Sequence, residues 1–266
     1  MSQANSISGY TIARNVVKFK YPIRECLTTL RPVCEDVVLA YDPYTEDGTY
    51  EVVKQLAQDL DLTLYESRWN MDNFNRGLEL GVQTDIAMSR CTNQWRLYLQ
   101  LDEAFHEDDV DQIKELPAQA AAQEACGVDF QRIYFYQNLH TIRRDWCAQI
   151  TRLTYGDTHT YSSGDGMSCI PTRREYAKHL LSPVWMFHYS RIGDPELISQ
   201  RVRNMDTFYH PEENLLPVEE VPEYDFVCRE FDNYAKEDAP KEVEPQLLTY
   251  QGTHPLPFAE LYQEFE

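Results

Sequence analysis

Residues 95–109 constrain the fold more than any other stretch of the chain. Residues 95–101 alternate and are rich in aliphatic and aromatic side chains, which is typical of a buried strand. Two carboxylates follow at once, Asp102 and Glu103. Acids at the end of a hydrophobic strand are typical of an α/β sheet with a ligand site at the carboxyl ends of its strands. The same acids could instead end the strand and cap a helix that begins near Glu107.

The first of these acids predicts a metal site. Mg²⁺ and Mn²⁺ are hard cations that bind one or two carboxylates and complete their coordination with water and diphosphate oxygens. Asp102 is therefore the residue that we expect to anchor a metal–diphosphate site.

The chain before this stretch alternates between strand and helix patterns. Strands are expected at residues 7–12, 36–41 and 62–65, and helices at 21–30 and 50–60. This order predicts βαβαβ units with a parallel sheet, and right-handed crossovers would bring the strand ends to one edge. Arg14, Asp42 and Asp102 would then face the same crevice.

The chain after the acidic stretch is expected to continue an α/β fold with a mixed, mostly parallel sheet flanked by helices. Helices are expected at 74–91, at 108–125 with Gly127 as a left-handed terminator, at 173–181 and at 195–208. Residues 130–155 predict an antiparallel extension, 164–166 a tight turn, and 183–189 a further apolar strand.

The charge of the chain limits the kinds of partner it could bind. The formal net charge of −20 over 266 residues argues against wide contact with a nucleic-acid backbone, which needs a basic surface. Seven scattered cysteines without metal-ligand spacing predict reduced thiols. Without a signal peptide or a membrane span in the sequence, we expect a cytoplasmic protein.

The composition changes near residue 210. Residues 211–266 hold 15 acidic and three basic residues and half of the 14 prolines. We therefore predict a domain at 1–210 and an acidic, Pro-rich C-terminal extension at 211–266, whose aromatic residues favour packing on the domain.

Several short motifs occur in an order that resembles a known family. They are Arg14-Asn15, Tyr21-Pro22, Asp47-Gly48-Thr49, Trp69-Asn70, the Leu-Gln-Leu-Asp-Glu run at 99–103 and Phe187-His188-Tyr189. Together they resemble the family-two-like glycosyltransferases of the GT-A (nucleotide-diphospho-sugar transferase) fold, in a branch with Gln-x-Asp-Glu in place of Asp-x-Asp. The resemblance covers about residues 7–210.

The resemblance implies a metal-dependent transferase with a nucleotide-diphosphate sugar as donor and Mn²⁺ or Mg²⁺ as cofactor. Asp102 matches the last acid of the metal motif, and His188 matches the histidine that completes the metal shell; Gln100 stands where the first acid normally lies. The residues expected at the nucleotide are Arg14, Asn15, Asp42, Asp47, Trp69 and Gln100. From the residues alone, a hydrogen-bonded core histidine is the favoured interpretation of His188. The two aspartates of the 42–47 loop are equally readable as turn formers.

The transfer also needs a carboxylate base for the acceptor hydroxyl. Asp165, in a Ser-Gly-Asp-Gly turn, is the first choice and Glu103 the second. An ordinary turn role for Asp165 stays open. The resemblance implies a single-displacement, inverting reaction, and the acceptor could be a glycan, a metabolite or a protein, with a modified nucleic acid the least favoured.

Two other functions remain open on the sequence. A nucleotidyltransferase that forms a sugar nucleotide would use the same acids, but it generally begins with a Gly-rich basic loop, for which residues 8–10 are a poor match. A non-catalytic nucleotide-sugar-binding protein is suggested by Gln100 and by the acidic extension. Release of pyrophosphate, or binding without turnover, would separate these functions from sugar transfer.

Overall fold

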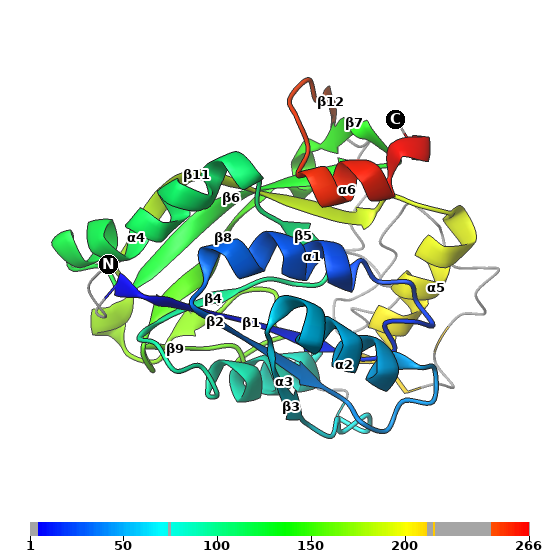
Figure 1. Ribbon diagram of the computed structural model, residues 1–266, viewed down its shortest axis with the longest axis horizontal. Coiled ribbons are helices and arrows are strands. Elements are labelled where there is room, and N and C mark those ends of the chain that lie inside the picture. The colour runs from blue at the N-terminus through cyan, green and yellow to red at the C-terminus, as the bar shows by residue number, and fades with distance from the viewer. Residues whose placement is uncertain (1–4, 74–75, 212–214, 216–245, 266) are drawn as a thin grey trace, which may run out of the picture.

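A ten-stranded mixed sheet forms the centre of the protein in this computed structural model, which describes residues 5–73, 76–211, 215 and 246–265 (Figure 1). The strand order is β12-β7-β6-β8-β4-β1-β2-β3, and β11 joins it beside β6 and β5. The strands are β1 (Ile7–Ala13), β2 (Asp36–Tyr41), β3 (Thr63–Glu66), β4 (Trp95–Tyr98), β5 (Glu103–Ala104), β6 (Gly127–Tyr136), β7 (Asn138–Arg143), β8 (Ala148–Tyr155), β11 (His179–Arg191) and β12 (Leu247–Thr249). A separate two-stranded sheet consists of β9 (His159–Thr160) and β10 (Ile170–Pro171).

The N-terminal half of the sheet is parallel. β1 pairs in parallel with β2 and β4, and β2 pairs in parallel with β3. The connections run through α1 (Ile23–Leu30) and α2 (Thr49–Leu60). The carboxyl ends of β1, β2 and β4 therefore meet at one edge, as the βαβαβ pattern predicts.

The C-terminal half mixes antiparallel and parallel pairs. β8 lies antiparallel between β4 and β6, and β7 and β12 extend the sheet by antiparallel pairing. β11 runs parallel to β6 and antiparallel to β5. The predicted α/β class, a mixed sheet flanked by helices, is confirmed, and so is the antiparallel extension at 130–155.

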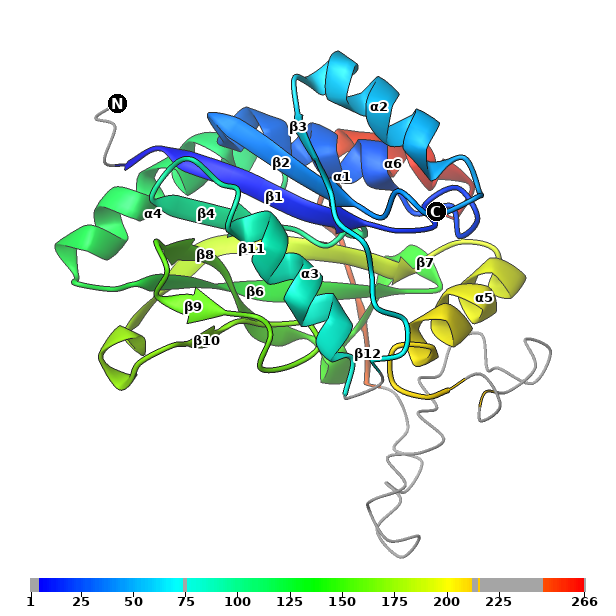
Figure 2. The same ribbon diagram turned by 90° about the horizontal axis from the view of Figure 1, so that it is seen from below.

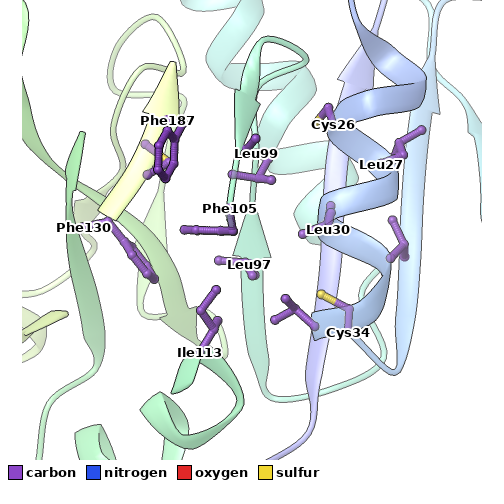
Figure 3. Packing of buried hydrophobic residues seen from close by; sticks show 14 of the residues in the cluster. Cys26, Leu27, Leu30, Cys34, Leu97, Leu99, Phe105, Ile113, Phe130 and Phe187 are labelled. Atoms are coloured by element: carbon purple, nitrogen blue, oxygen red, sulfur yellow. The ribbon is translucent and has the colours of Figure 1, made fainter. Parts of the chain in front are cut away.

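The larger hydrophobic core lies on one face of the sheet. It is covered by α1, α2, α4 (Val110–Ala122) and α6 (Leu256–Leu261), which supply buried side chains such as Leu27, Val53, Leu116 and Phe258. Figure 3 shows part of this core, where Leu97 and Leu99 lie between α1 and the aromatic side chain of Phe187.

The opposite face carries a smaller core and the cavity described below. α3 (Leu78–Met88) and α5 (Pro195–Asp206) lie on this side, away from α1, α2 and α6 (Figure 2). Tyr10 and Tyr98 of the sheet pack there against Ala87, Met88 and Tyr161. Alternate residues of a strand point to opposite faces, so Tyr98 faces this side and Leu97 the other.

The helix predicted at 74–91 is shorter than expected. α3 begins at Leu78, after Gly77 with a φ of +69°, while residues 74–75 lie outside the described residues. Its buried side chains include the polar Glu79 and Gln83 beside the apolar Ala87 and Met88. Buried hydrogen bonds therefore add to hydrophobic contacts in holding this helix on the sheet.

Two other local predictions were wrong. Residues 173–181 form one short 3₁₀ turn at Arg174–Tyr176, and from His179 onward they belong to β11, because pairing with β6 outweighs a weak helical pattern. Gly127 begins β6 rather than ending a helix in the left-handed region; Glu124, with a φ of +55°, takes the left-handed conformation after α4.

The described part of the C-terminal region packs on the domain. β12 pairs with β7, and Phe258 of α6 stacks on Tyr189 at a ring distance of 4.5 Å. Most of the region predicted as an acidic extension, residues 212–214, 216–245 and 266, lies outside the described residues, so the boundary near residue 210 stays a prediction. Among the described residues, no helix has the length and apolar character needed to cross a membrane.

Candidate functional site

A cavity of about 530 Å³ opens at the carboxyl ends of β1 and β4, and residues of α3 and α5 contribute to its lining. Six of the residues predicted for the site line it: Arg14, Trp69, Gln100, Asp102, Asp165 and His188. Strands, the turn after β4 and helix α5 all contribute to its wall. This is the position where open α/β sheets bind ligands.

Asp102 and His188 form the centre of one wall. The Asp102 Oδ1 atom lies 3.6 Å from the His188 Nε2 atom, and the two side chains are only 15% and 7% exposed. The turn between β4 and β5 carries Asp102, and its carbonyl accepts a hydrogen bond of 2.9 Å from the backbone nitrogen of Tyr189, which ties the turn to β11. Two segments 86 residues apart thus present one carboxylate and one imidazole to the same space.

The protonation states of this pair follow from burial. Burial, reinforced by the neighbouring charge of Glu103, raises the pKa of Asp102 to about 6. Burial and nearby arginine charges lower the pKa of His188 well below its usual value, so its imidazole is neutral. The Ser190 backbone nitrogen lies 3.5 Å from His188 Nδ1, a contact too long to fix the tautomer.

These two residues fit a divalent cation. A carboxylate and a neutral imidazole are both metal ligands, and their facing atoms are close enough to share one ion after a small adjustment. Within the described residues no group of three or more His, Cys, Asp or Glu side chains could hold a metal. A cation at this pair would have two protein ligands, and substrate oxygens and water would have to fill the other positions.

Glu103, predicted as the second choice of base, does not line the cavity. Its side chain is fully buried, and Arg152 binds both of its oxygens at 2.7 Å and 3.0 Å. The backbone nitrogen of Gln100 also donates to it at 3.0 Å. Because both oxygens are engaged and shielded from solvent, these contacts suit a structural carboxylate and do not favour the predicted role of base.

The residues predicted for the nucleotide divide into two groups. Arg14 lines the cavity, and Asp42 behind it accepts from the Arg14 Nε atom at 3.1 Å. Asp47 does not reach the cavity; it accepts hydrogen bonds from the backbone nitrogens of Val17 and Lys18 at 3.1 Å and 2.8 Å. Asn15 is half-buried with a φ of +52°, and it too is absent from the lining.

The polar buried face of α3 positions the segment that contains Trp69. Glu79 accepts from the backbone nitrogen of Asn70 at 2.8 Å, and Gln83 donates to the Arg68 carbonyl at 3.1 Å. Trp69 is thereby held in the cavity wall against the ring of Phe208 at a distance of 5.6 Å.

Asp165 lies on a loop that packs closely on α3. The Tyr209 hydroxyl donates to Asp165 Oδ2 at 2.7 Å, and Oδ1 accepts from the backbone nitrogen of Met167 at 3.0 Å. A side chain at Gly81 would clash with the carbonyl oxygens of this loop, so only glycine permits the approach. Asp85 of α3 holds the start of the loop by accepting from the backbone nitrogen of Tyr161 at 2.7 Å.

Sequence reasoning missed a group of basic and aromatic residues in the cavity wall. They are Arg132 and Tyr134 of β6, Trp146, Arg191 of β11 and Arg201 of α5. The three arginines are each at most 6% exposed. Alternation along β11 could have indicated Ser190 as a neighbour of His188, but nothing local marks Arg132 or Arg201 as facing the same cavity.

The comparisons with known proteins give only distant structural similarity. No family model and no curated protein matches this chain. S. aureus TarS 1–349 has a TM-score of 0.45 and 12% identity, over 75% of this chain and 64% of that chain. A longer S. aureus TarS structure gives 0.46 and 13%, over 75% and 39%.

A third solved structure, the mannosyltransferase PcManGT from Pyrobaculum calidifontis in complex with GDP-Man and Mn²⁺, has a TM-score of 0.36 and 18% identity, over 47% of this chain and 35% of that chain. The chain thus spans less than two thirds of the length of each of these structures. With TM-scores below 0.5 they do not decide the function, which has to rest on the site.

Proposed function

We propose that the chain is a glycosyltransferase of the GT-A type that moves a sugar from a nucleotide-diphosphate donor to a hydroxyl acceptor, with a divalent cation and inversion at the anomeric carbon. The observation that carries this proposal is the Asp102–His188 pair, 3.6 Å apart in a cavity at the carboxyl ends of parallel strands. Arg14 and Trp69 in the same wall suit a nucleotide, since one offers a cation and the other an aromatic face.

Asp102 and His188 would hold the cation, Mn²⁺ or Mg²⁺, and a cation there offsets the negative charge of the leaving diphosphate as a Lewis acid. The residues of the chain do the remaining work. Arg132 and Arg201 add positive charge around the same space, and the apolar side chains of Ile12 and Leu80 limit the entry of water.

Asp165 is the base of this proposal. The acceptor oxygen forms a bond to the anomeric carbon while the bond from that carbon to the diphosphate oxygen breaks, and the bonding electron pair leaves with the nucleoside diphosphate. The acceptor proton moves to the Asp165 carboxylate, which lines the cavity and is oriented by Tyr209. One displacement of this kind inverts the anomeric centre.

A nucleotidyltransferase is less well supported. Such an enzyme would need exposed backbone nitrogens after β1 to bind a triphosphate. Here the backbone nitrogens of Val17 and Lys18 already donate to Asp47.

The test is a panel of nucleotide-diphosphate sugars incubated with the purified chain, with Mn²⁺, with Mg²⁺ and with EDTA. We expect metal-dependent release of a nucleoside diphosphate with at least one donor, lost in Asp102→Asn, whereas Asp165→Asn keeps donor binding but loses turnover. Release of pyrophosphate from a nucleoside triphosphate and a sugar phosphate would favour the nucleotidyltransferase. Donor binding without turnover, in the presence of a wide acceptor panel, would favour a non-catalytic binding protein.

A further inference from the structure

Arg201 of α5 is held rigidly at the edge of the cavity. Its Nε atom donates to the carbonyl of Phe19 at 2.8 Å, and its Nη2 atom donates to the carbonyl of Lys20. The guanidinium also lies 5.2 Å from the ring centre of Tyr21. Although the residue is only 6% exposed, it lines the cavity.

The charge of Arg201 is only partly compensated by the residues that the structure describes. Its two bonded carbonyls are neutral, and Asp102 in the same cavity interacts with it electrostatically without forming an ion pair with it. The Nη1 atom is buried, and the Tyr262 hydroxyl lies near the guanidinium. A buried cation without a close counter-charge is costly, so an anion from outside the chain would stabilise it.

Arg132 of β6 has the same property. The Nε atom is buried without a hydrogen-bond partner, and the nearest carboxylate oxygen, on Glu103, is 3.8 Å from Nη1. That carboxylate is already bound through both oxygens by Arg152. Arg132 therefore brings a second charge, only partly compensated, to the cavity that Arg201 lines.

Arg152 is a buried arginine with a purely structural role, and its contacts differ from those of Arg132 and Arg201. Arg152 is completely buried and forms a bidentate pair with Glu103, and its third donor bonds to the Met167 carbonyl. Arg152 is absent from the cavity lining, whereas Arg132 and Arg201 are part of it. The chain thus neutralises the arginine outside the cavity and leaves positive charge on the two inside it.

We infer that Arg132 and Arg201 form an anion site that binds phosphoryl oxygens of the donor diphosphate directly, beside the Asp102–His188 pair. This inference rests on the proposed function and adds to it: the protein, and not the cation alone, contacts the diphosphate. Guanidinium groups suit this task because their donors match the geometry of phosphate oxygens. Donor binding should therefore persist in part when the metal is removed.

The experiment measures binding by calorimetry in EDTA and again with Mn²⁺, for UDP, GDP, CDP, ADP and dTDP, for the matching nucleosides, and for inorganic pyrophosphate. In EDTA we expect the preferred nucleoside diphosphate to bind at least tenfold more weakly to Arg132→Gln and Arg201→Gln than to the unchanged chain. Nucleoside binding should stay within twofold, which also shows that the variants are folded. Arg24→Gln is the matched control, since Arg24 is paired with Asp59 on the surface, away from the cavity.

Each other outcome decides against part of the inference. Unchanged diphosphate affinity in both arginine variants would overturn it. Binding of inorganic phosphate alongside saturating nucleoside diphosphate, lost only in the variants, would assign the arginines to a phosphate on the acceptor and overturn the donor assignment. If no nucleotide binds, the proposed function fails; pyrophosphate binding that depends on the arginines would then keep the anion site, and its absence would remove both.

Discussion

Asp102 and Glu103 are adjacent acids with opposite environments. Asp102 faces the cavity, 15% exposed at its side chain, and its Oδ1 atom lies 3.6 Å from the neutral His188 imidazole. Glu103, one peptide further, is fully buried and is bound on both oxygens by Arg152. Asp102 belongs to the turn after β4 and Glu103 begins β5, so the end of this turn separates an acid that faces the cavity from an acid that an arginine holds.

The contacts of Glu103 also position the loops around the cavity. The buried Glu103–Arg152 pair fixes the turn, since Glu103 also accepts from the backbone nitrogen of Gln100. Arg152 then bonds to the Met167 carbonyl, two residues from Asp165. The pair therefore connects the loop that carries the predicted metal ligand to the loop that carries the predicted base.

The largest expected effect is on the free energy of unfolding, when the buried acid Glu103 is replaced. Glu103→Gln leaves the Arg152 guanidinium buried without a counter-charge, and we expect a loss of about 3–5 kcal/mol in the free energy of unfolding. Urea denaturation followed by circular dichroism measures it, with Glu115→Gln on the exposed face of α4 as the control. A loss below about 1 kcal/mol would show that the two acids are not as different as their contacts indicate.

The corresponding substitution at the neighbouring acid is Asp102→Asn. Because burial already penalises the Asp102 charge and raises its pKa to about 6, its removal should leave the free energy of unfolding unchanged or slightly higher. Metal-dependent transfer should fall by at least about 100-fold, equivalent to about 2.7 kcal/mol of transition-state stabilisation. Steady-state kinetics and the same urea titration give both values, and a large stability loss with normal kinetics would reverse the roles assigned to the two acids.

His159 is a buried histidine away from the cavity, and the pH dependence of stability measures the free-energy cost of charging it. Its Nε2 atom lies 2.9 Å from His179 Nε2, and burial together with the charge of His179 lowers the pKa of His159 to about 4. An unfolded histidine titrates near 6.5, so between pH 6.5 and about 4 the unfolded state binds more protons and stability falls as the pH falls.

The measurement is the free energy of unfolding of the unchanged chain and of His159→Gln between pH 7 and pH 5. The stability advantage of the unchanged chain should shrink by about 2 kcal/mol over this range. Taking the difference between the two proteins removes the contribution of Asp102, whose raised pKa acts in the opposite direction. A constant difference would show that the pKa of His159 is not lowered in the folded state.

The smallest expected effect concerns Asp165, which combines features of both acids. Asp165 lines the cavity like Asp102, and like Glu103 it has a fixed hydrogen-bond donor, the Tyr209 hydroxyl at 2.7 Å. Tyr209→Phe should lower kcat about fivefold, about 1 kcal/mol, with KM nearly unchanged, because it loosens the orientation of the base without removing it. A change in KM alone would place Tyr209 in substrate binding instead.

The sequence alone predicted the parallel strands and the residues that follow them. Regular apolar patterns predicted β1, β2 and β4. Right-handed crossovers then predicted that Arg14 and Asp102 lie at one edge of the sheet, and both residues line the same cavity in the structure. The motif resemblance added His188, and the need for a base in a Ser-Gly-Asp-Gly turn added Asp165; both line the same cavity. These features depend on local pattern and on general rules of connection, so they can be worked out without distant contacts.

Other features were decided by tertiary structure. Glu103 took its role from Arg152, 49 residues away, and Arg201 reached the cavity because carbonyls some 180 residues earlier hold its guanidinium. Whether an acid at a strand end faces a ligand or an arginine depends on which partner the folded chain brings within about 3 Å, and ion pairs of this kind have no signature in the sequence around either residue. The sequence by itself therefore determined where the sheet presents its acids, while the packing of distant segments decided which of them stays available for chemistry.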